Sequence, residues 1–192
     1  MPETVVATRS LTEKLDAARV ASLLLATANA ALKNRGLHAI AVAIVAHAHR
    51  IISANDIDIA NGRDNGLSAG MQDRLRLDET RLGELAEAVR LVAALVDPVG
   101  ENVRGQTLPN GLRLSEVRVP FGVVGVIYEA RPNVTVDIAS LALKSGNSVV
   151  LRGGSAAENT NRALVAVIRD ALASVGLPAD AVQTIDEFGR DG

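Results

Sequence analysis

The sequence has 192 residues, a length typical of one domain or of a domain with part of another. Its 20 lysines and arginines nearly balance 22 aspartates and glutamates, so the net charge of −2 supplies no strong field toward nucleic acid or an anionic membrane. Aromatic residues make up 2%, which excludes stacking platforms for single-stranded nucleic acid, while 48% hydrophobic residues indicate a globular chain. There is no cysteine, hence no disulfide, no thiolate metal site and no cysteine nucleophile.

No segment is predicted to target or span a membrane. Residues 1–14 carry Glu3 ahead of any apolar stretch and lack the basic and apolar regions of a signal peptide. The longest uncharged run, between Arg35 and Arg50, is shorter than the ~20 apolar residues that a spanning helix needs. The sequence therefore indicates a soluble, cytoplasmic protein without membrane or nucleic-acid partners.

The chain begins with predicted helices. Ser10 and Glu13 have the spacing of a capping box, in which each side chain satisfies an unpaired amide at a helix start. We expect this helix to continue to about Asn34 and to stop at Gly36. A second helix is predicted over 37–54.

A third helix follows a predicted loop at 61–66, which contains two Asn-Gly pairs. It begins near Asp78 and ends before Pro98. Its apolar residues recur at spacings of three and four, which indicates one buried stripe of an amphipathic helix. That stripe consists of Leu82, Leu85, Ala86, Val89, Val92, Ala93 and Val96.

The pattern then changes to a predicted two-stranded arm. Strands over 103–108 and 112–119 flank Pro109-Asn110-Gly111, and Asn-Gly tolerates the positive φ that a tight hairpin needs. One face of this hairpin is polar. We expect an edge element or an assembly arm rather than a part of the core.

The second half alternates strands and helices. Strands are predicted over 123–128, 148–151 and 182–185, with helices over 134–144 and 157–175 between them. The first strand is almost continuously apolar, as expected for a strand buried on both faces of a parallel sheet. The order β-α-β-α-β is that of a doubly wound, Rossmann-type nucleotide-binding half, which binds its ligand at the carboxyl ends of the strands.

The first predicted strand ends at Tyr128-Glu129-Ala130-Arg131-Pro132-Asn133. Arg131 presents a planar, always-charged group suited to carboxylate or phosphate. Asn133 offers an amide donor for a developing oxyanion. The alternative is structural, with Pro132 and Asn133 starting the next helix and Asn133 as its N-cap.

The second predicted strand ends at Arg152-Gly153-Gly154-Ser155. Two glycines allow the backbone to approach a ligand closely, and amides at a helix start favour anions. Arg152 is suited to a ribose 2′-phosphate. The alternative is an ordinary tight turn, because neither the Gly-x-Gly-x-x-Gly fingerprint nor a Walker loop is present.

Other polar residues are predicted to serve structure. Lys144 ends a helix and Asp137 falls in the first turn of one, positions where their charges suit the helix dipole. His38, His47 and His49 have no further ligand at metal spacing and are interpreted as helix-surface or core histidines, so no metal site is predicted.

Two runs carry a resemblance to a known family. Residues 119–137 read VPFGVVGVIYEARPNVTVD and residues 143–155 read LKSGNSVVLRGGS. Both closely resemble γ-glutamyl phosphate reductases, with weaker matches earlier in the chain. The resemblance implies an aldehyde dehydrogenase-like α/β fold, built of amino-terminal helices (1–100), a β-hairpin arm (101–119) and the first half of an NADP-binding Rossmann-type domain (120–192).

The resemblance also implies an activity. In the family, NADPH reduces L-glutamyl 5-phosphate to L-glutamate 5-semialdehyde in L-proline biosynthesis and phosphate is released. A cysteine thiolate displaces the phosphate and the resulting thioester accepts hydride. The family's cysteine is expected beyond Gly192, so the 192 residues resemble an amino-terminal portion that is inactive alone.

Residue roles follow from the same resemblance. Residues 152–155 match the segment that approaches the adenosine ribose of NADP(H), and Tyr128 and Glu129 match the strand end beside the cofactor. Asn133 matches the oxyanion-stabilising asparagine, and Arg131 is assigned to an anionic group of the substrate. The arm implies a homo-oligomer. Two alternatives remain, a nucleotide-binding module without chemistry and a subunit-interaction module.

Overall fold

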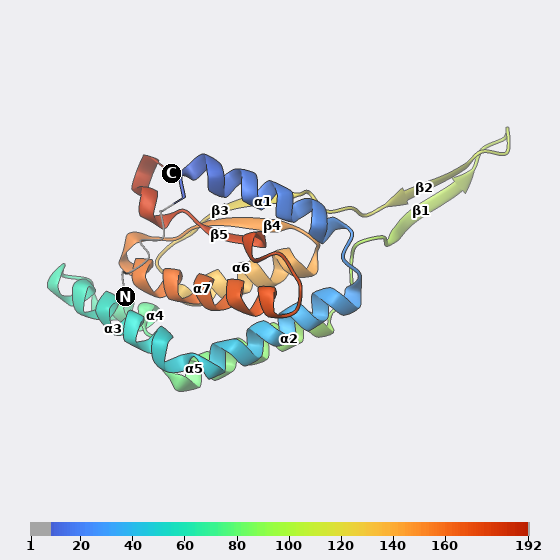
Figure 1. Ribbon diagram of the computed structural model, residues 1–192. Helices are drawn as coiled ribbons and strands as arrows, with labels where there is room; N and C mark the ends of the chain where they lie inside the picture. The colour runs from blue at the N-terminus through green and yellow to red at the C-terminus, as the bar shows by residue number, and fades with distance from the viewer. Residues whose placement is uncertain (1–8, 192) are drawn as a thin grey trace, which may run out of the picture.

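The computed structural model describes residues 9–191, and Figure 1 shows their arrangement. Glu3, on which the prediction of no targeting segment rests, lies outside the described residues. The helices are α1 (Leu11–Ala26), α2 (Ala30–Ala46), α3 (Ala48–Asp64), α4 (Ala69–Leu75), α5 (Glu79–Ala94), α6 (Pro132–Lys144) and α7 (Glu158–Ser174). The strands are β1 (Asn102–Thr107), β2 (Arg113–Val117), β3 (Val123–Ile127), β4 (Ser148–Arg152) and β5 (Val182–Thr184).

A parallel sheet in the order β3-β4-β5 forms the centre of the body. Helix α1 covers one face of this sheet, and α6 and α7 cover the other (Figure 1). Helices α2, α3 and α5 form a further layer outside α6 and α7. The Lys14 side chain on α1 donates to the Thr184 carbonyl at 2.7 Å, which attaches α1 to β5 across 170 positions of the sequence.

One hydrophobic core joins the helical first half to the sheet. Its fully buried side chains come from almost every layer: Leu25, Leu37, Ile40, Ile51, Leu82, Leu143, Leu151, Leu164 and Ile168. Burying a side chain of this size contributes about 1.5–3 kcal/mol. The amino-terminal helices therefore stabilise the same unit that presents the strand ends.

The predicted end of the first helix is wrong. Helix α1 ends at Ala26, and Asn29 caps α2 by accepting from the Leu32 amide at 2.9 Å. Gly36 lies buried inside α2, where a Cβ atom would collide with Cδ1 of Leu177. Close packing between α2 and a distant loop, rather than helix termination, therefore explains this glycine.

The prediction of a helix over 37–54 is also wrong. Helix α2 ends at Ala46, and α3 starts at Ala48 and continues through the first Asn-Gly pair to Asp64. The short helix α4 was not predicted. No single helix within residues 9–191 is long and apolar enough to cross a membrane, and α2 with α3 passes that test only as a pair bent by 67°.

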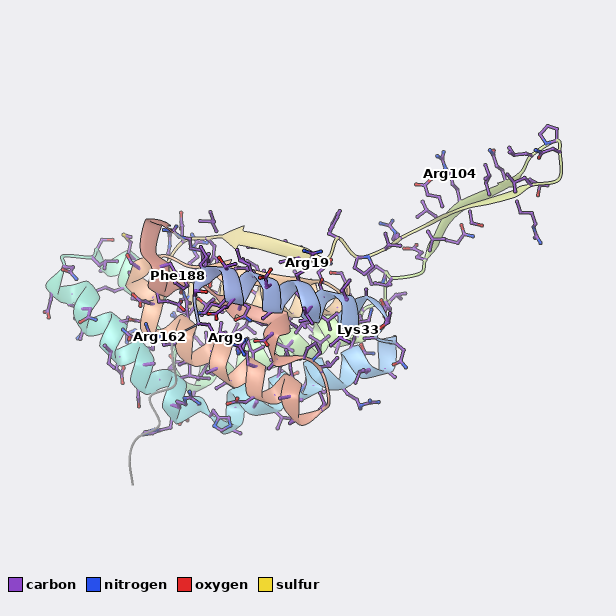
Figure 2. The ribbon with its side chains drawn as sticks, turned by 45° about the horizontal axis from the view of Figure 1, so that its top comes forward. Arg9, Arg19, Lys33, Arg104, Arg162 and Phe188 are labelled. Atoms are coloured by element: carbon purple, nitrogen blue, oxygen red, sulfur yellow. The ribbon has the colours of Figure 1, made fainter. Side chains whose placement is uncertain are left out.

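Two buried lysines link the helical layers. Lys33 of α2 is 1% exposed and its Nζ lies 2.7 Å from the Asp97 carboxylate after α5 (Figure 2). Lys144 is buried at the end of α6 and donates to Asn34 Oδ1 at 2.7 Å and to the Ala93 carbonyl at 2.8 Å. The predicted structural role of Lys144 is confirmed, although its partners lie on other helices.

The amphipathic helix and the arm are confirmed. Asp78 caps α5, and the predicted stripe is buried apart from Val92, which is half-buried, and the exposed Val96. The arm projects away from the body (Figures 1 and 2), and every residue of β1 and β2 is exposed. Arg104 pairs with Glu116 across the two strands at 2.6 Å.

The prediction that the first parallel strand is buried on both faces is wrong. Within the described residues, β3 pairs only with β4 and forms one edge of the sheet. Its exposure alternates, with Val124 and Val126 partly buried, while Val123 is 37% and Ile127 76% exposed. The apolar run therefore leaves one face of β3 uncovered by residues 9–191.

Candidate functional site

The candidate residues lie where the three parallel strands end. Because carboxyl ends of parallel strands meet at one edge of a sheet, residues after β3, β4 and β5 converge there. The Tyr128 amide donates to the Arg152 carbonyl at 3.1 Å, which joins the first two ends. The Ile185 amide donates to the Leu151 carbonyl at 2.9 Å and joins the third.

A chain of side-chain hydrogen bonds runs through this edge. The Tyr128 hydroxyl lies 2.6 Å from Thr135 Oγ1, which donates to Asn161 Oδ1 at 2.9 Å. Asn161 Nδ2 donates to Asp186 Oδ2 at 3.1 Å. The other Asp186 oxygen accepts the Gly153 amide at 2.7 Å. The chain fixes the orientation of both predicted strand ends against the third.

Burial shifts the pKa values of two groups in this network, the Tyr128 hydroxyl and the Asp186 carboxyl. Burial raises the pKa of Tyr128 to about 12; the hydrogen bond with Thr135 opposes this shift, and the Asp186 charge adds a smaller increase. Burial also raises the pKa of the Asp186 carboxyl above its ordinary value, although the Gly153 amide and Asn161 oppose that shift. Tyr128 is therefore a neutral hydrogen-bonding group at physiological pH.

Gly153 and Gly154 allow close packing between the strand ends. A Cβ at Gly154 would lie 2.7 Å from the backbone nitrogen of Ala130. A Cβ at Gly153 would collide with Asn161 and lie 3.2 Å from the Tyr128 ring. The backbone therefore approaches other parts of the chain at these positions, and the space next to each glycine is filled by protein atoms.

The predicted anion site at the start of the long helix is wrong for α7, because a carboxylate of the chain already occupies it. Asp58 on α3 is 2% exposed and accepts four hydrogen bonds from the first turn of α7. The donors are the Asn159 amide and Nδ2, at 3.3 and 2.8 Å, and the Thr160 amide and Oγ1, at 2.8 and 2.6 Å. Asp58 thus caps α7 across about 100 positions.

Arg152, Ser155 and Glu129 are polar residues that remain accessible at this edge. Arg152 Nε and Nη2 donate to the Gly189 carbonyl at 2.8 and 2.6 Å, which fixes the guanidinium beside the β5 end. Ser155 is exposed and starts a short 3₁₀ turn (Ser155–Ala157) rather than α7 itself. Glu129 is exposed after β3.

Arg131 and Asn133 face a different hollow. The N-cap residue of α6 is Arg131, and Pro132 is its first helical residue, so the alternative that Asn133 is the cap is wrong. Asn133 is exposed and lines the same groove as Asp137, which lies in the second turn of α6 rather than the first. Arg131 Nε lies 3.5 Å from the Glu129 carboxylate.

The structure therefore separates the candidates into two groups. Tyr128, Arg152 and Gly153 are joined at the sheet edge, whereas Arg131 and Asn133 line a groove of about 660 Å³ against α4 and α5. The histidines are all exposed on α2 and α3 or between them, which confirms the surface interpretation. Residues 9–191 contain no group of three or more histidines or acidic residues placed to hold a metal ion.

Two important residues were missed from the sequence. Asp186 directly follows the third predicted strand. Because ligands bind at the carboxyl ends of parallel strands, the argument that identified Arg152 could also have identified Asp186. Asp58 gives no such signal, because it lies in the middle of a helix and its partners are about 100 positions away. Only the packing of α3 against α7 brings them together.

Comparisons with known proteins agree with this architecture. Residues 10–192 match the sequence model of the aldehyde dehydrogenase family. The γ-glutamyl phosphate reductase of Leifsonia xyli subsp. xyli is 61% identical over 183 residues, which are 95% of this chain and 44% of that protein. That of Kineococcus radiotolerans is 65% identical over 175 residues, covering 91% of this chain and 40% of the relative.

Solved structures show the same relationship. A γ-glutamyl phosphate reductase from Thermotoga maritima superposes with a TM-score of 0.92 at 41% identity, over 95% of this chain and 44% of that one. A probable aldehyde dehydrogenase from Listeria monocytogenes, 17% identical, shares the fold with a TM-score of 0.65 over 91% of this chain and 36% of that one.

The chain thus spans less than half the length of the relatives it matches, which is consistent with an amino-terminal portion. The predicted aldehyde dehydrogenase-like α/β fold and the resemblance to γ-glutamyl phosphate reductases are both confirmed. On its family match and its fold, the chain belongs to the aldehyde dehydrogenase family.

Proposed function

We propose that this chain carries the cofactor-binding part of an NADPH-dependent γ-glutamyl phosphate reductase. The reaction is the reduction of L-glutamyl 5-phosphate to L-glutamate 5-semialdehyde with release of phosphate, a step of L-proline biosynthesis. The proposal rests on the identity of 61% over 95% of the chain to a relative of that name. The division into 1–100, 101–119 and 120–192, and a soluble, cytoplasmic location, belong to the same proposal.

NADPH supplies hydride in this reaction, and the strand-end edge has residues that suit its ribose and 2′-phosphate. Arg152 contributes a fixed positive charge, and Ser155 an accessible hydroxyl. Tyr128 and Glu129 border the same edge, and Gly153 and Gly154 keep the strand ends close enough to form one surface. The Asp58 carboxylate at the start of α7 directs the cofactor phosphates away from that helix end.

The reacting half of the proposed chemistry needs a nucleophile that the 192 residues do not contain. In the family mechanism a cysteine thiolate displaces phosphate, and this sequence has no cysteine. Asn133 is proposed to stabilise the oxyanion and Arg131 to bind an anionic group of the substrate. In subtilisin, loss of the nucleophile costs about 10⁶-fold in kcat. We therefore expect the 192-residue chain to bind NADPH without reducing glutamyl phosphate.

Fluorescence titration with NADPH and NADH tests this proposal. We expect NADPH to bind more tightly than NADH, and Arg152→Gln to weaken NADPH binding about tenfold or more, since a charge-assisted contact is lost. Arg162→Gln is the matched control, because Arg162 is an exposed arginine of α7 paired with Glu158 (Figure 2). No binding at millimolar NADPH, or equal affinity for both cofactors, contradicts the proposal.

A homo-oligomer formed through the arm is the second part of the proposal. Strands β1 and β2 pair only with each other in the described residues, and all their side chains are exposed. Such free edges are templates for pairing with another strand. The side chains include apolar ones, Val103, Leu114 and Val117, that a partner would cover.

Size-exclusion chromatography at several concentrations tests the arm. We expect an oligomer for the intact chain and a monomer when residues 103–117 are replaced by a short glycine-serine turn. A monomeric intact chain contradicts the assembly role of the arm and leaves the cofactor proposal to the NADPH titration. An oligomer without NADPH affinity favours the subunit-interaction alternative instead.

A further inference from the structure

The groove beside the start of α6 has a mixed set of charges. It measures about 660 Å³ and lies between α6 and the segment that joins α4 to α5. Its cationic side chains are Arg74, Arg76, Arg81 and Arg131, and its acidic ones are Asp73, Glu84 and Asp137. A groove with both signs of charge suits a ligand that itself carries both signs, rather than a simple anion.

Part of this charge is already neutralised within the protein. Arg81 donates to the Asp73 carboxylate at 2.9 Å and to the Asp73 and Arg76 carbonyls, so Arg81 and Asp73 satisfy each other. Among residues 9–191, the one ion pair of the Arg131 side chain is the 3.5 Å contact with Glu129, and this side chain is 44% exposed. Arg131 therefore retains most of its hydrogen-bonding capacity for a ligand.

Asp137 is the acidic group with the clearest need for a cation. It is half-buried beside the neutral Asn133 side chain, and none of the ion pairs among residues 9–191 includes it. Burial raises the pKa of its carboxyl above the ordinary value, and the Asn133 side chain opposes that shift. A ligand cation that pairs with Asp137 would relieve this desolvation cost.

The groove also leads toward the strand ends. Arg74 and Arg131 line both the groove and an adjoining pocket of about 370 Å³. That second pocket is bordered by Ala130 and Ala156, which are neighbours of the Gly154 and Ser155 edge. The groove is therefore connected with the proposed cofactor surface through this second pocket.

We propose that this groove binds an α-amino acid with an acidic side-chain terminus, in which Asp137 holds the ammonium group and Arg131 and Arg74 hold the acidic groups. This assignment rests on the proposed function and identifies which residues select the amino-acid part of the substrate. Asp137 acts in recognition and takes no part in bond making. Inorganic phosphate alone lacks the ammonium group and uses only half of the groove.

Isothermal titration calorimetry of the 192-residue chain tests the proposal with two stable probes. L-2-Amino-5-phosphonopentanoate has an ammonium, a carboxylate and a phosphonate, and 5-phosphonopentanoate is the same molecule without the ammonium. We expect the amino compound to bind wild-type protein about tenfold more tightly, the effect of one charge-assisted contact at a half-exposed site. This comparison needs no variant, so it does not depend on how a substitution folds.

Three variants locate the effect. Asp137→Asn should remove the preference for the amino probe and leave binding of 5-phosphonopentanoate within about twofold. Arg131→Gln should weaken both probes. Asp56→Asn, a carboxylate exposed on α3 and away from the groove, should change neither. Thermal melts confirm that each variant is folded.

Several outcomes overturn the assignment. They are equal affinity of the wild-type chain for both probes, absence of binding by either, and an Asp137→Asn variant that retains the preference. The cofactor titration distinguishes this failure from failure of the proposed function. A chain that binds NADPH but neither probe loses the groove assignment alone, whereas a chain that binds the amino probe but no NADPH loses the cofactor proposal alone.

Discussion

Replacement of Asp58 by alanine tests how far one buried carboxylate holds the strand-end region together. The substitution removes the acceptor of four hydrogen bonds to the first turn of α7. Loss of a helix cap costs about 1–2 kcal/mol. The Thr160 hydroxyl is fully buried, and loss of its acceptor adds about 1–3 kcal/mol. The sum is about 3 kcal/mol of unfolding free energy.

A thermal melt followed by circular dichroism measures this change. For a chain of this size each kcal/mol shifts Tm by about 2–4 °C, so Asp58→Ala should lower Tm by about 6–12 °C. Asp58→Asn keeps one acceptor oxygen and should lose about half as much. Asp56→Asn, two residues away and exposed, should leave Tm unchanged. A decrease below about 2 °C for Asp58→Ala would refute the role of Asp58 as the cap of α7.

Two further substitutions test packing and charge. Gly154→Ala places a Cβ 2.7 Å from the Ala130 backbone nitrogen, which cannot rotate away, so it should lower the unfolding free energy by about 1–3 kcal/mol and weaken NADPH binding. The control is Gly83→Ala in α5, which has open space around it and should raise the unfolding free energy by up to about 1 kcal/mol. Equal melting temperatures of the two variants argue against the strand-end contact. Lys33→Met should cost about 2–3 kcal/mol at pH 7, because it leaves the Asp97 carboxylate without its buried partner. Burial alone would raise the pKa of Asp97, but the hydrogen bonds from Lys33 and a backbone amide hold this pKa below 3.8. The stabilisation is therefore fully present above pH 3.8 and is lost as the pH falls through the lowered pKa of the folded protein. Urea unfolding at pH 7 and about pH 2 should therefore show the difference between wild type and Lys33→Met shrinking in acid, and a constant difference contradicts the assignment.

The features that the sequence predicted correctly depend on neighbouring residues. The capping box of Ser10 and Glu13 is formed, with the Glu13 amide donating to Ser10 Oγ at 3.3 Å and the Ser10 amide to the Glu13 carboxylate at 2.7 Å. Asp78 caps α5 by accepting from the Arg81 amide at 2.9 Å. Gly111 takes the positive φ of 86° expected at the hairpin tip. Each signal acts within about four residues, so tertiary structure has little opportunity to override it.

The features that the sequence did not predict depend on distant partners. Gly36 has the local character of a helix stop, and only Leu177, from a loop after α7, explains why a glycine is needed inside α2. The apolar composition of β3 gives no information on how many neighbours cover it. Asp58 and Asp137 were unremarkable as helix residues, because their significance lies in what α7 and the α4–α5 segment bring next to them.

The attachment of α1 to the sheet has a consequence for how the protein folds during translation. The bond from Lys14 to the Thr184 carbonyl joins residues 170 positions apart, and α1 contacts β4 and β5. At about 5–20 residues per second, a ribosome takes roughly 10–30 s to supply those strands after α1 has been made. During that interval the face of α1 that carries Ala18 and Leu25, both fully buried in the folded protein, has no sheet to cover it. Helix α1 therefore docks on the sheet late, and its apolar face stays uncovered until translation has reached β5.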